Sequence, residues 1–508
     1  MLRTRKTGLV LSYMNTFLSM LCGLFLSSFL LRQLGDTDYG VYQTMSAFAN
    51  YLVLLEFGTG TVLARNLSAC RTKGEDELQI EKNISTIWTV TGAMSVVIFL
   101  VSVLFYCFIG KIYAGSLSAA QIVQGKRIFV FIIVFLISSF CSQTLSGLAL
   151  AQEDYAFSSL MSIFKLISRT LLLAALILKF KNAMIIAAVD ASLGLIIAVF
   201  TYFYCRRKFK VKINFKNFDV LVLKNSLPLC LAMFLQTVVN QSNNIVGKFI
   251  LGVLSGPEDV ALYSVALYIY SIFSSLSTIP VSLYMPQVTK DVLSGKEGKE
   301  LTKTLVQPCR LMVLVSGVVL FGFIACGRQF IDIVYGTDYA LAWLMSLLLI
   351  FPSFLNMANA VVLNVLDVKN KRLMRSWFLM ITTALNIIMT VVGIKLFGIV
   401  AVAAATGIAT LIQVVIMNVY YQKVIGIKVI YLFANAFKGL LPYQLLGALV
   451  GYAVGLIVEN SFVSFVVSGC SFVVIAMGGF VLFGKNQDEE QLIKKYVRKV
   501  IRTKKQEQ

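Results

Sequence analysis

Long apolar runs are the feature that most constrains this 508-residue chain. A helix of about 20 apolar residues crosses the hydrocarbon of a bilayer, so runs of 18 or more residues indicate spanning helices. About fourteen such runs follow one another, which predicts an all-α polytopic membrane protein. The predicted spans start near Gly8, Tyr42, Ile84, Arg127, Phe157, Ala183, Leu227, Ala261, Cys309, Leu341, Leu373, Gly398, Gly439 and Phe462.

The composition excludes several other classes of protein. The chain is 58% hydrophobic and only 14% charged, whereas soluble proteins carry about 25% charged residues. A cytosolic enzyme, a disordered chain and a secreted disulfide scaffold are therefore excluded. The chain has no histidine, which excludes histidine proton relays and histidine metal sites. Its nine cysteines are scattered and form no Cys-x-x-Cys pair. We interpret them as small buried apolar residues and not as disulfide partners or metal ligands.

Basic residues set the predicted orientation. Lys and Arg number 45 against 24 Asp and Glu, a formal net charge of +21. In a membrane protein such an excess lies in cytoplasmic loops facing anionic lipid, so no nucleic-acid partner is predicted. With the N-terminus inside, the inside segments carry about four times as many Lys and Arg as the outside loops. Both termini are therefore predicted to be cytoplasmic. The first apolar stretch, Gly8 to Leu31, is too long for a signal peptide core, so we interpret it as a span.

A dense basic segment divides the chain into two predicted halves. It runs Arg206-Arg207-Lys208-Phe209-Lys210-Val211-Lys212 between spans six and seven. A weak repeat, Phe29 to Tyr42 and Phe249 to Tyr263, recurs about 220 residues apart, as in transporters with a central site between two lobes. We expect an N-lobe of spans one to six (1–205), a basic cytoplasmic linker (206–226), a C-lobe of spans seven to twelve (227–422), spans thirteen and fourteen (423–484) and a basic tail on the inner leaflet (485–508).

Ionisable residues within spans are costly in hydrocarbon and are therefore candidate functional residues. Lys165 and Arg169 share one face of span five because they are four residues apart. Arg169 lies about 18 Å along the span, too deep for comfortable snorkelling. The pair either faces an anionic substrate, since Arg fits phosphate oxygens, or pairs with acids on other helices.

Two acids are predicted as coupling or counter-charge residues. Glu56 lies near the middle of span two, just before Gly58 and Gly60, which allow close helix approach or a local break. Asp190 lies about a third of the way into span six. Either acid neutralises Lys165 or Arg169, or else serves as a protonatable or sodium-coordinating carboxylate.

Further polar residues complete the predicted substrate-binding set. The cations near span ends either snorkel to the interface or attract an anionic headgroup. The polar run in span seven must face a cavity or another helix, where it binds sugar hydroxyls or ties helices together. These residues are Arg65, Lys248 and Arg310, and, from the run Asn240-Gln241-Ser242-Asn243-Asn244, Asn240, Asn243 and Asn244.

Five segments of the chain resemble a known family. The segment Arg32-Gln33-Leu34-Gly35-Asp36-Thr37-Asp38-Tyr39-Gly40-Val41-Tyr42 resembles the "R-x-LG-x-x-x-YG-x-Y" signature of polysaccharide-biosynthesis flippases. Glu56-Phe57-Gly58-Thr59-Gly60-Thr61 with Arg65 resembles their "acid-x-G-x-G … R" pattern. Ser226-Leu227-Pro228, Leu251-Gly252 and Ala261-Leu262-Tyr263-Ser264-Val265-Ala266 resemble their "P … LG … YS-x-A" run. The chain is thus similar to Wzx-like flippases of the multidrug/oligosaccharidyl-lipid/polysaccharide exporter (MOP) superfamily.

The resemblance implies a function and a mechanism. Members move a lipid-linked oligosaccharide, usually on undecaprenyl diphosphate, across a bacterial plasma membrane for capsule, exopolysaccharide or O-antigen assembly. Two six-helix lobes rock around a cationic cavity, and two peripheral C-terminal helices follow. No covalent chemistry, cofactor or metal is expected; coupling is to protons, sodium or membrane potential. Many members carry an Asp in span seven, where this chain has Asn243 and Asn244.

Partners and rival functions follow from the same resemblance. The expected partners are the lipid-linked oligosaccharide, membrane lipids and a glycan polymerase or glycosyltransferase. A cation-coupled multidrug antiporter has a similar fold, but its cavity should be acidic, whereas the deep charges here are at least as much basic. A lipid II flippase and a non-transporting membrane scaffold remain as alternatives.

Overall fold

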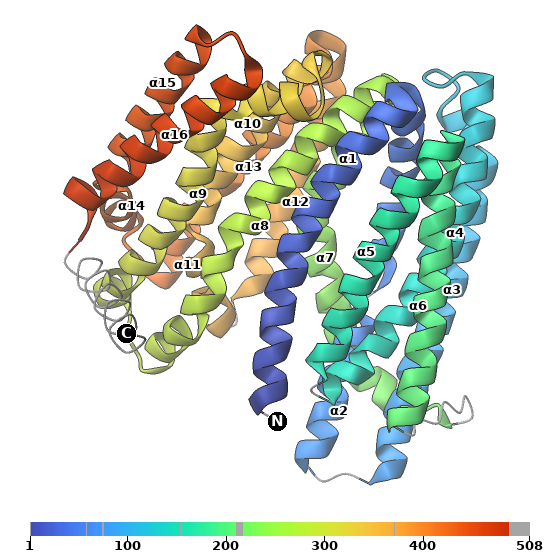
Figure 1. The fold of residues 1–508 in the computed structure, drawn as a ribbon. Helices are drawn as coiled ribbons and strands as arrows, with labels where there is room; N and C mark the ends of the chain where they lie inside the picture. The colour runs from blue at the N-terminus through green and yellow to red at the C-terminus, as the bar shows by residue number, and fades with distance from the viewer. Residues whose placement is uncertain are drawn as a thin grey trace, which may run out of the picture. The chain divides into compact units, whose positions relative to one another are not determined.

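The computed structural model describes residues 2–56, 58–73, 76–152, 154–209, 217–369 and 371–486. Within these ranges every regular element is a helix, which confirms the predicted all-α class (Figure 1). The elements are α1 (Leu2–Val53), η1 (Leu54–Glu56), α2 (Thr59–Lys73), α3 (Glu77–Ile112), α4 (Ala119–Ala151), α5 (Tyr155–Phe180), α6 (Met184–Phe209), α7 (Val220–Leu254), α8 (Pro257–Leu293), α9 (Gly298–Val334), η3 (Thr337–Tyr339), α10 (Ala340–Ala358), α11 (Ala360–Val368), α12 (Arg372–Phe397), α13 (Val400–Tyr420), η4 (Tyr421–Ile425), α14 (Val429–Phe437), α15 (Leu441–Ile457), α16 (Ser461–Gly479) and η5 (Phe480–Gly484).

The described part of the structure contains fewer helices that are long and apolar enough to cross a membrane than the number of spans predicted from the sequence. Among the described residues, 11 helices are long and apolar enough to cross a membrane, or up to 12 if the bent pair α14 and α15 forms one span. The count of about fourteen therefore stays a prediction. Part of the difference lies in α1, which contains two predicted span starts, Gly8 and Tyr42, and is counted once.

A glycine divides α1 into two arms. If straight, its 52 residues would extend about 78 Å, far more than the roughly 30 Å of hydrocarbon. Gly35 interrupts the helix with φ 78° and ψ 170°, a conformation that side chains with a Cβ disfavour. The chain reverses at this bend and descends towards α2 (Figure 1). The bend thus lets one long helix contribute two predicted spans.

The chain forms two compact units. One comprises Met1–Tyr268 with Thr383–Ala405, and the other comprises Ile269–Thr382 with Thr406–Gln508. The first unit contains α7 and the start of α8 because α7 packs against α1, α2 and α3. The predicted lobe boundaries at 205 and 227 stay predictions.

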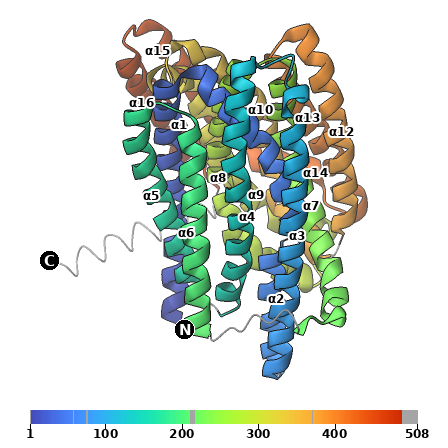
Figure 2. The same cartoon turned by 90° about the vertical axis from the view of Figure 1, so that its right-hand side faces the viewer.

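The core of the first unit lies among α1, α3 and α4. Buried side chains from these helices form a continuous apolar cluster that includes Met45, Ile98, Phe105 and Phe129. The ring of Phe48 stacks on that of Phe105 with centroids 3.4 Å apart. Helices α3, α4 and α6 run side by side in this unit (Figure 2). The cluster fixes the second arm of α1 against α4, next to the cavities described below.

Small residues bring α2 and α4 into backbone contact. A Cβ added to Gly147 would lie 2.2 Å from the carbonyl oxygen of Gly60, so only glycine fits there. Beside this contact, the buried hydroxyl of Thr144 is 2.9 Å from those of both Thr59 and Thr91. These hydroxyls satisfy one another in an apolar environment, where an unpaired polar group is costly.

One carboxylate joins the start of α5 to the end of α6. Asp154 caps α5 by accepting from the backbone N–H of Phe157. It also accepts from the Tyr204 hydroxyl at 2.6 Å and from Lys208 Nζ at 2.5 Å. The rings of Phe157 and Tyr204 stack with centroids 3.7 Å apart. These contacts hold the two helices that carry Arg169 and Asp190.

In the second unit, α9 is the central helix and packs against α10, α14, α15 and α16. Arg310 of α9 is 1% exposed. Its guanidinium donates to the backbone carbonyls of Asn435, Lys438 and Gly484. The side chain therefore ties the ends of α14 and η5 to α9.

Replacing Gly147 by Ala is expected to lower the free energy of unfolding by about 1–3 kcal/mol, because the added methyl group overpacks the contact with Gly60. Thermal unfolding in detergent measures the effect. Gly92→Ala on α3 is the matched control, since nothing lies within 4 Å of a Cβ built at Gly92. Equal melting temperatures for the two variants would contradict the predicted close contact.

The Asp154 carboxylate predicts a pH-dependent contribution to stability. Burial raises its pKa, but hydrogen bonds from Lys208 and Tyr204 lower it more, so the net shift is downward. A depressed folded-state pKa means that the stabilisation is present above the unfolded pKa of about 3.9 and is lost as pH falls through the folded value.

Asp154→Asn should therefore cost about 0.2–1 kcal/mol at pH 7, since the Lys208 side chain is 50% exposed. The difference from wild type should begin to shrink below about pH 4 and should vanish only once the pH falls below the depressed folded-state pKa. Melting temperatures measured from pH 3 to pH 7 test this. Glu459→Gln, at an exposed loop position, controls for charge alone. A difference that persists unchanged at pH 3 would show that the carboxylate charge is not responsible.

Candidate functional site

Two adjoining cavities open within the first unit, among α1, α4, α5 and α6. The tyrosine cavity has a volume of about 320 Å³ and the serine cavity about 360 Å³. They share a wall of Val53, Phe135 and Leu136. The polar residues of the tyrosine cavity include Tyr39, Tyr42, Gln43, Asn50, Arg169, Asp190 and Tyr268. Those of the serine cavity include Ser139, Ser142, Gln143, Ser146, Ser158, Ser162, Lys165 and Thr201.

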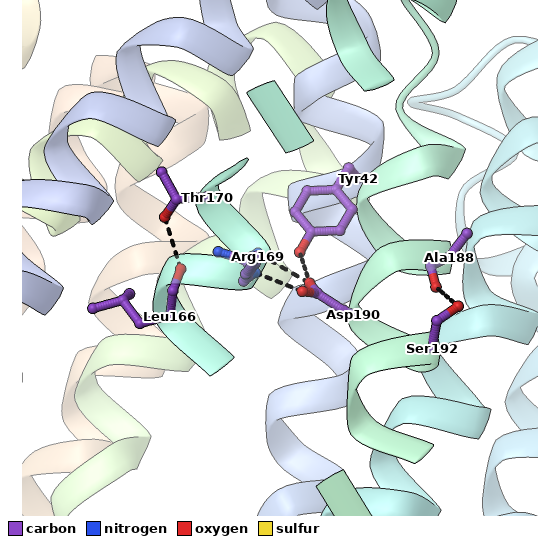
Figure 3. Close-up of polar contacts among 7 residues, drawn as sticks. All are labelled: Tyr42, Leu166, Arg169, Thr170, Ala188, Asp190 and Ser192. Atoms are coloured by element: carbon purple, nitrogen blue, oxygen red, sulfur yellow. Dashed lines mark hydrogen bonds and ion pairs between the residues drawn. The ribbon is translucent and has the colours of Figure 1, made fainter. Parts of the chain in front are cut away.

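An ion pair between α5 and α6 dominates the tyrosine cavity (Figure 3). Arg169 Nε donates to Asp190 Oδ1 at 2.5 Å, and Nη2 donates to Oδ2 at 3.0 Å. The Tyr42 hydroxyl of α1 donates to the same Oδ2 at 3.4 Å. The two-pronged geometry is the strong form of an arginine–carboxylate contact. Three helices are thus joined at one carboxylate.

This pairing selects between the interpretations left open by the sequence. Of the two acids that could neutralise Lys165 or Arg169, Asp190 is the one that pairs, and Arg169 is the cation. For Arg169 the structure therefore shows the alternative in which the cation pairs with an acid on another helix. The reason is the packing of α5 on α6, which brings positions 21 residues apart into contact.

Lys165 lies one turn before Arg169 and lines the serine cavity. Its ammonium is 4.8 Å from the ring centroid of Phe135, a cation–π distance. Within the described residues Lys165 forms no ion pair, in contrast to Arg169. The two cations therefore sit on opposite sides of the wall that the cavities share.

A second cation reaches the tyrosine cavity through a hydrogen-bonded chain. Lys248 Nζ of α7 donates to Gln43 Oε1 at 3.2 Å, and Gln43 Nε2 donates to the Tyr39 hydroxyl at 2.7 Å. Tyr268 also lines this cavity, and its hydroxyl donates to the carbonyl of Met20 at 2.8 Å. Lys248 is thus part of the site by way of Gln43.

Glu56 lies in η1, at the break between α1 and α2. Gly58 follows with φ 63°, so the predicted local break is present there, and the predicted close helix approach occurs at Gly60. Glu56 lies within hydrogen-bonding reach of Gln143, which lines the serine cavity. Glu56 therefore lies next to the Gln143 amide, which lines the serine cavity.

The other predicted substrate-binding residues lie elsewhere. Arg65 is exposed on α2 and lines neither cavity. Arg310 belongs to the second unit, and its donors are used by backbone carbonyls, so the expected contact with an anionic headgroup is replaced by a structural role. The side chains of Asn240, Asn243 and Asn244 lie outside the described part of the chain.

Most of the uncharged polar lining is absent from the set of site residues predicted from the sequence. Yet Ser158, Ser162, Lys165 and Arg169 follow one another at intervals of four, three and four residues on α5. This spacing marks one helix face, and a search for polar stripes within apolar spans would have found it. No comparable signal predicts that Gln43 bridges Lys248 and Tyr39, because Lys248 lies 205 residues from Gln43, although Tyr39 and Gln43 are one turn apart on α1.

Comparison with known proteins gives a family match and one curated relative. The family described as "Polysaccharide biosynthesis protein" matches residues 6–291, more than half of the chain. The probable low-salt glycan biosynthesis flippase Agl15 of Haloferax volcanii is 24% identical over 183 residues. That alignment covers 35% of this chain and 38% of the relative's length.

Solved structures with the same fold include two kinds of transporter. The lipid II flippase MurJ in an inward closed conformation matches with a TM-score of 0.71 and 15% identity, covering 93% of this chain and 99% of that chain. An inward-facing multidrug resistance MATE family transporter of the MOP superfamily matches with a TM-score of 0.60 and 12% identity, covering 84% and 99%. At these identities the matches show a shared fold alone.

The Arg169–Asp190 pair predicts strong energetic coupling between two substitutions. Asp190→Leu alone leaves a partly buried guanidinium without its carboxylate, whereas Arg169→Met with Asp190→Leu removes both charges. A double-mutant cycle of unfolding free energies should give a coupling of about 0.5–3 kcal/mol. Thermal or urea unfolding in detergent measures it. Strictly additive single-variant effects would show that the pair contributes no stability.

Proposed function

Because the chain belongs to the polysaccharide biosynthesis protein family, we propose that it is a flippase for a lipid-linked oligosaccharide. The proposed cargo is carried on a polyprenyl diphosphate such as undecaprenyl diphosphate, and it moves from the inner to the outer leaflet of a bacterial plasma membrane. The flippase relative and the MOP-type fold support this activity. The glycan would enter capsule, exopolysaccharide or O-antigen assembly.

The observation that carries the proposal is a cation lining a polar cavity between long apolar helices. Lys165 lines the serine cavity without a carboxylate partner among the described residues, and ionisable groups at such positions mark substrate pathways. A negatively charged cargo recovers the electrostatic stabilisation that Lys165 lacks. A cationic drug would instead be repelled, which argues against the antiporter alternative.

Arg169 joins this site by exchange of its partner. Its fork holds Asp190 at 2.5 and 3.0 Å, and phosphate oxygens offer the same bidentate geometry. We propose that the diphosphate of the cargo replaces Asp190 on Arg169 during transport. While the cargo is bound, Asp190 remains bonded to Tyr42. In the empty protein, Asp190 is the counter-charge of Arg169.

Orientation and partners are part of the proposal. Both termini are placed in the cytoplasm on the basis of the Lys and Arg distribution. The basic linker and tail then face anionic lipid, and they would offer binding surfaces to a glycosyltransferase or polymerase. The segments 210–216 and 487–508 lie outside the described residues.

Export tests the proposed site. Lys165→Ala with Arg169→Ala should reduce surface glycan at least tenfold, since a lost charge-assisted hydrogen bond is worth about 1.5–3 kcal/mol. Native mass spectrometry of gently extracted wild-type protein should also show a co-purifying polyprenyl-diphosphate sugar that the double variant lacks. Lys179→Ala, on the same helix, controls for loss of a lysine. Normal surface glycan in the double variant, present at wild-type levels in the membrane, would overturn the site.

Membrane potential is the proposed driving force for at least part of the cycle. Moving each negative charge outward is favoured by about 2.3 kcal/mol per 100 mV of inside-negative potential. Glu56 and Asp190 are the candidate coupling carboxylates, because the span-seven Asp of many relatives is replaced by Asn243 and Asn244. Export measured in vesicles should accelerate when a potassium diffusion potential is imposed. A rate that does not respond to the potential would exclude this driving force.

A further inference from the structure

The serine cavity has a chemistry of its own that transport of a diphosphate does not explain. Its hydroxyls come from three helices: α4 supplies Ser139, Ser142 and Ser146, α5 supplies Ser158 and Ser162, and α6 supplies Thr201. The remaining polar lining is Gln143 and Lys165. A volume of about 360 Å³ lies at the small end of the range of about 300–1,000 Å³ typical of small-molecule sites.

The hydroxyls of this cavity offer both acceptors and donors. Ser146 and Ser162 donate to the backbone carbonyls of Ser142 and Ser158, at 2.8 and 3.0 Å, so their oxygens remain as acceptors. The hydroxyl oxygens of Ser139 and of Ser158, two residues of the lining, are buried and have no hydrogen-bond partner in the described part of the chain, so no protein acceptor engages either donor. A phosphate group accepts only, whereas a sugar ring both donates and accepts through adjacent hydroxyls.

The charge of the cavity is set by one residue. Lys165 is its sole ionisable lining group among the described residues, and Arg169, across the shared wall, is occupied by Asp190. One ammonium balances one negative charge, whereas a more highly charged anion would remain partly uncompensated away from water. Apolar side chains, among them Phe135, Phe140 and Met161, also line the cavity and suit the apolar face of a ring.

We propose that the serine cavity is a subsite for a sugar ring that carries a single anionic group, with Lys165 binding the anion and the serines binding the ring hydroxyls. The anion is either the carboxylate of an acidic sugar in the glycan or the phosphate attached to the sugar nearest the lipid. This proposal rests on the proposed flippase function for its biological meaning. Its test is a binding measurement that requires no transport.

Isothermal titration of the purified full-length protein tests the subsite with four probes: D-glucuronate, glucose 1-phosphate, D-glucose and inorganic phosphate. At least one anionic sugar should bind at least tenfold more tightly than glucose and than inorganic phosphate. A preference for glucuronate assigns the site to an acidic glycan residue. A preference for glucose 1-phosphate assigns it to the sugar phosphate of the lipid carrier.

Two kinds of variant separate the charge from the hydroxyls. Lys165→Gln should abolish the preference for the anionic sugar and leave glucose binding within about twofold. Ser139→Ala with Ser158→Ala should weaken all three sugars at least threefold and leave the preference unchanged. Lys179→Gln is the matched control, because Lys179 is on the same helix and also lies over a phenylalanine ring, 5.4 Å from the centroid of Phe180; it should bind all probes as wild type does.

Three outcomes would overturn the proposal. Equal binding of glucose and both anionic sugars would remove the anion requirement. Inorganic phosphate binding as tightly as glucose 1-phosphate would remove the sugar requirement. A preference retained in Lys165→Gln would place the anion elsewhere. None of these outcomes bears on export, so the flippase function would stand or fall separately by the surface-glycan assay.

Discussion

Hydrocarbon offers no hydrogen-bond partner, and this constraint governs both the backbone and the polar side chains of the protein. Backbone groups are satisfied within helices, so the described regular structure is entirely helical. Deep polar side chains must then pair with one another or line a cavity. The buried hydroxyls of Thr59, Thr91 and Thr144 illustrate the first solution, and the serine cavity illustrates the second. The proposed substrate site lies where pairing is incomplete.

The deep cations obey the same rule in different ways. Arg310 uses backbone carbonyls and thereby fastens the ends of α14 and η5 to α9. Arg169 uses Asp190, and Lys248 uses Gln43. Among the described residues, the charged group of Lys165 contacts an aromatic ring and forms no ion pair. These cations can therefore be ranked as candidates for binding an external anion by how fully each is already paired within the protein. Lys165 ranks first and Arg310 last.

Helix packing positions the cavity walls that carry these charged side chains. The bend at Gly35 lets one helix contribute two arms, and the second arm brings Tyr39 and Tyr42 into the tyrosine cavity. Asp154 fixes the start of α5 against the end of α6. Because Arg169 and Asp190 lie on these same two helices, the cap outside the span and the ion pair inside it hold the helices in one register. In the segment around the first bend, Tyr39 and Tyr42 therefore line the tyrosine cavity, and Gly35 shapes the backbone that places them there.

The sequence by itself determined the helical membrane class, the ionisable residues within the spans and the shared face of Lys165 and Arg169. It also marked Gly58 and Gly60 as points of a local break or a close helix approach. These properties follow from local spacing and composition, because helix period and hydrocarbon thickness act on neighbouring residues. Only the tertiary structure decided that Asp190 pairs with Arg169, that Gln43 bridges Lys248 to Tyr39, and that Arg310 is structural. Those contacts depend on the register and rotation of helices distant in sequence, which packing sets and no local pattern records.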